Sequence, residues 1–206
     1  MPVASHEVYP MFVEPYFRAN IAGTVTPQQI AYIKNLKMVN NPENMISENL
    51  YIFEEPELKS IKDAVQEVLD IYARDVLCIP QQIYVTQSWS LVCKPNAGMH
   101  GHSHSNSILS GSLYYCELPD PPSSMVFTRH TSYQQIDLPP DPNKRNIYNS
   151  PINRITPRQD DILLFSSRLT HLVEQNTSGQ PRYSIAFNTF VKGRVGDYRA
   201  VTELKL

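Results

Sequence analysis

Two stretches within the first eighty residues have the apolar and polar spacing of helices. Thr26 followed by Pro27, with Gln29 at the third helical position, is typical of a capped helix start, and we expect this helix to reach about Leu36. A second stretch starts at residues 55–57 and ends near residue 77, ahead of Pro80. Its apolar residues recur at three- and four-residue steps: Leu58, Ile61, Val65, Val68, Leu69, Tyr72 and Val76. Such an amphipathic stripe must be buried, and a sheet face is the natural partner.

After Pro80 the pattern changes to short, partly alternating runs of β-forming residues. We expect strands over residues 83–92, 112–116, 125–128, 161–165, 171–174 and 183–191, with a proline-rich, polar loop over 139–146 that is a candidate lid. Many short strands with proline-broken connections predict a sandwich, barrel or jelly roll. The sequence therefore predicts a mainly β (α+β) single domain over residues 1–206, with a helical N-terminal part (1–80) packed on the sheet core (81–206).

Composition narrows the range of functions. The chain has 206 residues, of which 41% are hydrophobic and 18% charged, so it is expected to be globular, and its net charge of −2 argues against extended nucleic-acid or membrane binding. We see no secretory signal and no apolar run long enough to span a bilayer. The odd number of cysteines, Cys78, Cys93 and Cys116, favours free thiols in a reducing compartment, which predicts a cytoplasmic protein, and each cysteine is expected to be buried as a small apolar side chain.

Histidines carry the strongest candidate chemistry. His100, His102 and His104 alternate in the chain, and alternate residues of an extended strand point to one face. His171 follows a distant apolar run, and if it folds back onto the cluster it completes a three-ligand metal site with open positions. Histidines interleaved with glycine and serine are also compatible with a polar loop that binds nothing. Their position after a strand and a glycine turn favours the metal site.

Arg182 and Ser184 add a second half to this candidate site. Residues two apart on a strand face the same way, so a guanidinium fork and a hydroxyl would lie side by side, and together they suit a bound carboxylate. An Arg-x-Ser pair is weak evidence on its own. Its weight comes from its position eleven residues after His171.

These motifs together resemble the iron(II)- and 2-oxoglutarate-dependent oxygenases, above all a group of small oxygenases of unassigned substrate from marine bacteria and phages. The resemblance runs from about residue 83 to the C-terminus. It rests on Trp89, Gly98, His102-x-His104, Asn106-Ser107, Leu109-Ser110-Gly111, Tyr114-Tyr115, Asp161-x-Leu163-Leu164-Phe165-x-Ser167, His171, Asn176 and Arg182-x-Ser184-Ile185-x-Phe187-Asn188. It implies a double-stranded β-helix, which is a relative of the jelly roll.

The resemblance also implies the cofactors and their ligands. Fe(II) would be held by His102, His104 and His171, and 2-oxoglutarate and O2 would be the co-substrates of a dioxygenase that forms succinate and CO2 while hydroxylating a substrate. Arg182 and Ser184 would bind the far carboxylate of 2-oxoglutarate. Other candidate contacts are Tyr114 or Tyr115, only one of which can face inward from a strand, and the amides of Asn106 and Asn188. Trp89 is a candidate wall of the pocket or a core residue.

The usual triad of this family pairs a His-x-Asp/Glu motif with a distal histidine, and here His104 takes the carboxylate position. An all-histidine site is more positive by one charge and also suits Zn(II). Two other registers stay open: His100 with His102, or His104 with Asn106 as a weak ligand.

Two other functions compete with a 2-oxoglutarate-dependent hydroxylase. They are a cupin-like metal-binding jelly roll without redox chemistry and a metal-free structural jelly roll. Arg182-x-Ser184 favours the oxygenase, because a non-redox cupin has no need of residues that bind the far carboxylate of a keto acid. The sequence leaves the primary substrate open between a protein side chain and a metabolite, and a homodimer would be ordinary.

Overall fold

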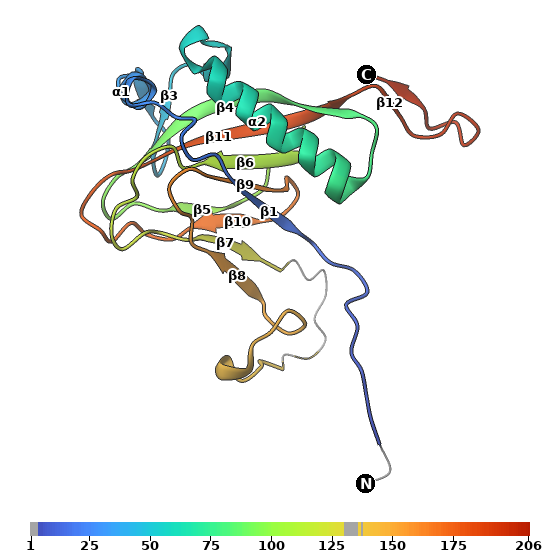
Figure 1. Ribbon diagram of the computed structural model, residues 1–206. Helices are drawn as coiled ribbons and strands as arrows, with labels where there is room; N and C mark the ends of the chain where they lie inside the picture. Colours follow the sequence, from blue (N-terminus) through green and yellow to red (C-terminus); the bar gives the residue numbers. More distant parts are fainter. Residues whose placement is uncertain (1–3, 130–135, 137) are drawn as a thin grey trace.

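The computed structural model describes residues 4–129, 136 and 138–206, and within them two antiparallel sheets form the body of the molecule (Figure 1). The larger sheet has the strand order β1 (Tyr16–Asn20), β9 (Asp161–Ser166), β6 (Leu109–Leu113), β11 (Arg182–Lys192), β4 (Gln82–Cys93), β3 (Met45–Ser47) and β2 (Met38–Asn40). The smaller sheet has the order β5 (Met99–His102), β10 (His171–Val173), β7 (Met125–Thr128) and β8 (Ile152–Ile155). A separate hairpin joins β12 (Arg194–Val195) to β13 (Leu204–Lys205).

The helices lie where their sequence patterns place them. α1 (Pro27–Lys34) begins with the expected capping box. The backbone N–H of Gln29 donates to Thr26 Oγ1, and Gln29 Oε1 accepts from the backbone N–H of Thr26. The second helical stretch starts with the 3₁₀ turn η2 (Pro56–Leu58), continues as α2 (Lys59–Tyr72) and ends in the π-helical turn η3 (Ala73–Leu77). α2 crosses the large sheet (Figure 1), and its apolar stripe is buried as far as Tyr72. Short 3₁₀ turns also occur at η1 (Ile52–Glu54) and η4 (Pro142–Lys144).

Alternation along the strands divides the apolar residues between two layers. In β9, Ile162 and Leu164 pack with the stripe of α2, whereas Leu163 and Phe165 pack with residues of β7 and β8 between the two sheets. The large sheet is therefore buried on both faces, which explains why β9 reads as a continuous apolar run. The space between the sheets is the part of the core that also holds the functional side chains.

Three features differ from the sequence prediction. The strand predicted over residues 112–116 is β6 at Leu109–Leu113, so the two tyrosines follow the strand instead of lying in it. Residues 1–80 are not only helical, because β1 pairs with β9 and the β2–β3 hairpin extends the sheet beside β4. Cys78 is exposed, whereas Cys93 and Cys116 are buried.

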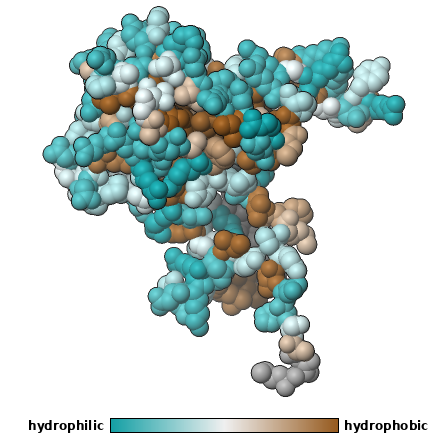
Figure 2. Space-filling view, viewed as in Figure 1, coloured by the Kyte–Doolittle hydropathy of each residue, from teal (hydrophilic) through white to brown (hydrophobic). Residues whose placement is uncertain are grey.

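The segments outside the sheets carry exposed apolar side chains. They lie on the N-terminal segment and on residues 136 and 138–148, which project away from the sheets (Figures 1 and 2): Val8, Tyr9, Met11, Phe12, Val13, Ile136, Leu138, Ile147 and Tyr148. The region predicted as a loop over 139–146 contains only η4. No helix in the described part of the chain is both long and apolar enough to cross a membrane.

Candidate active site

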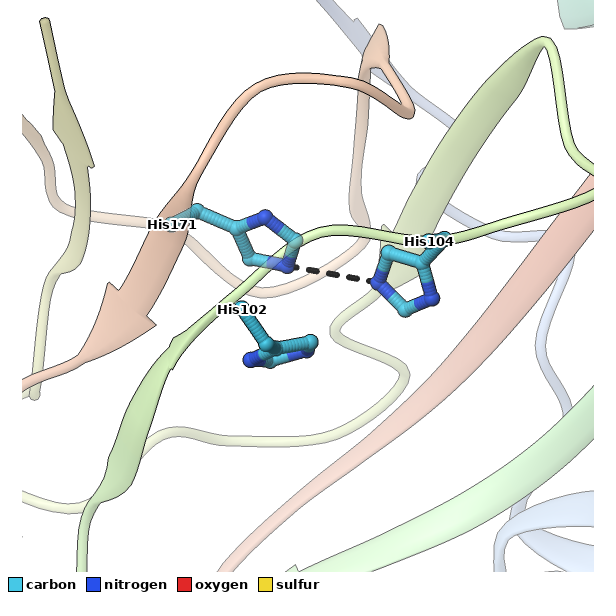
Figure 3. A group of neighbouring side chains, drawn as sticks. All are labelled: His102, His104 and His171. Carbon is cyan, nitrogen blue, oxygen red and sulfur yellow. Dashed lines mark hydrogen bonds between the residues drawn. The ribbon is translucent and has the colours of Figure 1, made fainter. Parts of the chain in front are cut away.

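Three histidines meet between the sheets, as the spacing of the histidine motifs predicts. His102 ends β5 and His171 begins β10, and these two residues are register partners in the small sheet. His104 follows β5 in an irregular segment. The backbone N–H of His104 donates to the carbonyl of Ser167 at 2.9 Å, which fixes this segment. The three rings converge on one point from these separate segments (Figure 3).

The geometry of the rings suits a shared metal ion. One nitrogen of each histidine lies within 4.8 Å of the others, and His104 Nε2 and His171 Nε2 are 3.4 Å apart. Two nitrogens bound to one metal at about 2.1 Å and about 90 to 110° lie roughly 3.0 to 3.4 Å apart. Nδ1 of His102 lies 2.9 Å from the His100 carbonyl, and Nδ1 of His171 lies 3.0 Å from the Leu169 carbonyl. Because Nδ1–H donates to these oxygens, each Nε2 keeps its lone pair for a metal.

The surroundings also keep two of the rings neutral. Burial lowers the pKa of His171 to about 4, and burial followed by the neighbouring charge of His102 lowers the pKa of His104 to about 4. Only neutral imidazole has a lone pair for a metal, so both rings are in the binding form near neutral pH.

The other candidate ligands lie away from this point. The His100 side chain is 59% exposed, and its Nδ1 lies 3.2 Å from a carboxylate oxygen of Glu43. Asn106 is exposed, with a positive φ of 56° in a turn, and it does not line the cavity between the sheets. The cluster that the structure assembles is thus that of His102, His104 and His171, and not either of the two other registers.

A chain of hydroxyls holds the segment that carries His104. Ser167 Oγ lies 2.9 Å from Ser110 Oγ and donates to Ser107 Oγ at 2.8 Å, so the ends of β9 and β6 are tied to the segment after His104. Asn188 takes part in the same network, since its Oδ1 accepts from Ser110 Oγ at 2.9 Å. Asn188 does not line the cavity, so its amide serves this network instead of reaching toward a bound keto acid.

Arg182 and Ser184 lie on β11 and face the same cavity, as residues two apart on a strand should. Arg182 is only 5% exposed, and its Nε and Nη1 have no hydrogen-bond partner. A buried guanidinium with unpaired donors is costly unless an anion pairs with it. Arg182 is therefore a candidate anion-binding residue on the large sheet, in the cavity that the three histidines also line.

The two tyrosines after β6 point to different layers. Tyr114 lines the cavity, and the Arg182 guanidinium lies 5.7 Å from the centre of its ring. Tyr115 packs instead with the α2 layer. Burial raises the pKa of Tyr114, which keeps its phenol protonated and able to donate a hydrogen bond.

A single cavity of about 370 Å³ contains both halves of the site. It is lined by the three histidines, Arg182, Ser184 and Tyr114, and by Trp89, whose ring centre lies 6.4 Å from that of His104. None of residues 139–146 lines this cavity, so the structure gives the lid hypothesis no support. Two residues that were not predicted from the sequence, Asn41 and Asn44, also line the cavity from the turn between β2 and β3. No motif marks them, because only long-range pairing brings this turn to the site.

Comparison with known proteins places this arrangement in one family. A family model described as "Putative 2OG-Fe(II) oxygenase" matches residues 87–188, a range that includes both histidine motifs and Arg182. No curated protein sequence matches the chain.

Solved structures share the fold at low sequence identity. HygX from Streptomyces hygroscopicus, with nickel and 2-oxoglutarate bound, has a TM-score of 0.58 at 14% identity, over 85% of this chain and 82% of HygX. A Pseudomonas putida prolyl-4-hydroxylase has a TM-score of 0.58 at 11% identity, over 85% of this chain and 92% of that one. The epimerase SnoN, in complex with Fe³⁺, α-ketoglutarate and nogalamycin RO, reaches 0.64 at 10% identity, over 86% of this chain and 79% of SnoN. These similarities confirm the double-stranded β-helix fold.

Proposed function

Because the chain belongs to the Fe(II)- and 2-oxoglutarate-dependent oxygenases, we propose that it is a dioxygenase that hydroxylates a substrate in the cavity between its two sheets. The observation that carries this proposal is the pairing of a three-histidine cluster with a buried, unpaired arginine in one cavity. A non-redox metal site accounts for the histidines but not for Arg182.

The residues present fit the cofactors that the family uses. His102, His104 and His171 supply three neutral nitrogens for Fe(II), and Arg182 supplies two free donors for the far carboxylate of 2-oxoglutarate. Ser184 and the phenol of Tyr114 line the same part of the cavity and are positioned to add hydrogen bonds. An all-histidine set leaves the metal without a protein carboxylate, so the negative charge at the site comes from the keto acid.

His102, His104 and His171 would hold the iron, which would supply the oxidative chemistry: one O2 and one 2-oxoglutarate would give succinate, CO2 and the hydroxylated substrate. The protein's own part is to hold and orient the reactants. Arg182 lies on the large sheet and the histidines lie on or next to the small sheet, so a keto acid that contacts both is fixed at its two ends. Trp89 lines the cavity beside His104 and would limit the space open to a substrate on that side.

We also propose a cytoplasmic location and a primary substrate that is a protein side chain or a metabolite. The three unpaired cysteines support the location, because disulfides are rare in a reducing compartment. The net charge of −2 supports a substrate other than extended nucleic acid.

An anaerobic titration tests the proposed function. Metal-free protein is mixed with Fe(II) and 2-oxoglutarate under argon, and the weak visible charge-transfer band of the chelate is recorded before air is admitted and succinate is measured. We expect the band only when both components are present, and slow succinate formation in air without any substrate. Zn(II) in place of Fe(II) is the control and should give neither signal. If Fe(II) gives no band and no succinate, the oxygenase assignment fails.

A further inference from the structure

On one flank of the cavity, the outermost strand of each sheet is exposed at its edge, and a short turn from the large sheet contacts the small one. β2 is the outermost strand of the large sheet on this side and β5 is the outermost strand of the small sheet. The turn at residues 41–44, between β2 and β3, connects them: Glu43 accepts the amide of His100 at 2.6 Å, and its other carboxylate oxygen lies 3.2 Å from His100 Nδ1. We call these four turn residues the strap.

The strap presents an unfilled hydrogen-bond acceptor at the cavity. Asn44 lines the cavity and is only 8% exposed, and its Oδ1 has no hydrogen-bond partner. Its amide is held in place, because Nδ2 lies 3.7 Å from Met99 Sδ and the backbone bonds between Asn41 and Asn44 close the turn at 2.8 and 3.1 Å. A buried carbonyl oxygen without a partner is costly, and a ligand that donates a hydrogen bond to it removes this cost.

The side chains that line the cavity on this flank are apolar, apart from these two amides and the ring of His100. Ile46, Leu91 and Met99 line it beside Asn41 and Asn44. Among the described residues that line the cavity, Arg182 is the only one with a permanent charge, and the proposed function assigns it to the co-substrate. The Glu43 carboxylate is occupied by His100. A charged substrate group would therefore be desolvated here without a partner, which is unfavourable.

Size sets a further limit. The cavity volume of about 370 Å³ is near the lower end of the roughly 300–1,000 Å³ usual for ligand pockets, and 2-oxoglutarate must share it. The room that is left suits a group of side-chain size.

Resting on the proposed function, we propose that the flank formed by the strap, Ile46, Leu91 and Met99 is the primary-substrate subsite. It takes an uncharged group of side-chain size with an N–H or O–H donor, which bonds to Asn44 Oδ1. The strap is thus a specificity-determining element, and Asn44 is its recognition residue.

The test compares succinate formation with and without side-chain-sized probes. The uncharged probes are the N-acetyl amides of serine, threonine, asparagine and glutamine. Their matched controls are the N-acetyl amides of valine, which lacks the threonine hydroxyl, and of aspartate, which replaces the asparagine amide by a charge. We expect at least one uncharged donor probe to stimulate succinate formation above the substrate-free rate, and its control to stimulate it at least about fivefold less.

Variants of the strap locate the effect. Asn44→Leu should lower the ratio of stimulated to substrate-free succinate formation at least about tenfold, since it removes the acceptor. Asn40→Leu, at an exposed position outside the cavity, should leave that ratio unchanged. If Asn44→Leu does not fold, the near-isosteric Asn44→Asp serves instead, and it should gain a response to the cationic N-acetyl-2,4-diaminobutyramide that the unmodified protein lacks.

Three results overturn this inference. The first is that no uncharged donor probe stimulates a protein that forms succinate on its own. The second is that valine or aspartate probes work as well as their partners. The third is that Asn44→Leu weakens 2-oxoglutarate binding and leaves the ratio of stimulated to substrate-free succinate formation unchanged. That result would mean that the Asn44 side chain contacts the co-substrate instead of the substrate. Failure of the proposed function looks different, because then substrate-free succinate formation and the charge-transfer band are both absent.

Discussion

At the scale of single residues, Arg182 should control 2-oxoglutarate binding without controlling metal binding. Arg182→Met keeps roughly the length of the side chain but removes its N–H donors, among them Nε and Nη1, which have no hydrogen-bond partner. Hydrogen bonds to a charged group contribute about 1.5–3 kcal/mol, so we expect the dissociation constant of 2-oxoglutarate to rise about tenfold to 150-fold. Titration of the charge-transfer band gives this constant, and the bound metal is measured separately. Arg154→Met is the matched control, because Arg154 forms an exposed ion pair with Glu174. If the dissociation constant of 2-oxoglutarate is the same in the two variants, Arg182 does not have its proposed role.

The register of the histidine motif is a second residue-scale question. His100→Ala should keep the metal, since this side chain is exposed and contacts Glu43, whereas His102→Ala should lose it. Bound iron or nickel after desalting, measured by elemental analysis, separates the two variants. A metal-free His100→Ala protein would move the ligand pair to His100 and His102.

The lowered pKa values also predict how the metal-free protein responds to pH. The pKa of His104 and that of His171 are about 4 in the fold, below the ordinary 6.5, so the unfolded chain binds protons more readily at these positions than the native protein does. The free energy of unfolding should therefore fall as the pH drops from about 6.5 to about 4. Urea denaturation of metal-free protein measures this slope.

A control variant makes the pH prediction specific. His171→Phe removes one of the two lowered histidines and places a ring beside Phe127 and Phe165, which already contact the His171 ring. Its stability should fall less steeply with decreasing pH, whereas His6→Phe, at an exposed position, should leave the slope as it is. Parallel curves for all three proteins would mean that the pKa of His171 is not lowered.

At the scale of elements, β6 depends on a glycine that only tertiary packing explains. A Cβ on Gly111 would lie 2.2 Å from Phe187 Cζ and 2.8 Å from Leu164 Cδ2, so the side chains of β9 and β11 occupy the space beside it. Gly111→Ala should lower the free energy of unfolding by about 1–3 kcal/mol through overpacking, which urea denaturation measures. Gly101→Ala, whose Cβ would meet only Thr170 at 3.6 Å, should cost less. Similar values for the two variants would show that β6 can shift to accept the methyl group.

The elements that the sequence predicted are those with strong local signals. The capping box at Thr26 and the stripe of α2 are local, and both helices form where expected. β6 was misplaced because Tyr114 and Tyr115 have high β propensity, whereas Ser110 and Gly111, which are in the strand, have little. β2 and β3 are three residues each, too short to show alternation, and they exist because β4 pairs with them.

The candidate site divides in the same way. His102, His104, His171, Arg182 and Ser184 were predicted because the motif spacing and the family resemblance both mark them, and the structure gathers them around one cavity. Asn106 and Asn188 belong to the same motifs but lie outside the cavity, since a turn and a hydroxyl network use them. Asn44 has no motif at all. Residues that act through long-range placement alone are the ones that sequence reasoning misses.

At the scale of the whole molecule, strands from both parts of the chain share the large sheet. Residues 16–47 supply β1, β2 and β3, and residues 82–192 supply β4, β6, β9 and β11. Our prediction of a single domain over residues 1–206 stays a prediction, and this interleaving favours it. The proposed metal ligands lie on or beside the small sheet and the proposed anion-binding residue Arg182 lies on the large one, so a bound keto acid would link the two sheets.

This linkage predicts that metal and 2-oxoglutarate stabilise the fold together. With Ni(II) in place of iron, so that no turnover occurs, each ligand at about 100 times its dissociation constant adds about 2.7 kcal/mol. For a chain of this size that corresponds to an increase in Tm of roughly 5–10 °C per ligand. 2-Oxoglutarate should produce its increase only when Ni(II) is present, because the keto acid chelates the metal. Differential scanning calorimetry of the four ligand states measures this.

Arg182→Met separates the linkage from simple chelation at the metal. In this variant Ni(II) should still raise Tm, whereas the further increase from 2-oxoglutarate at the same concentration should shrink, because the keto acid then contacts the small-sheet side alone. If 2-oxoglutarate raises Tm equally with and without Arg182, its far carboxylate does not reach the large sheet. In that case the unpaired donors of Arg182 serve some other anion, and the two halves of the cavity would not act as one site.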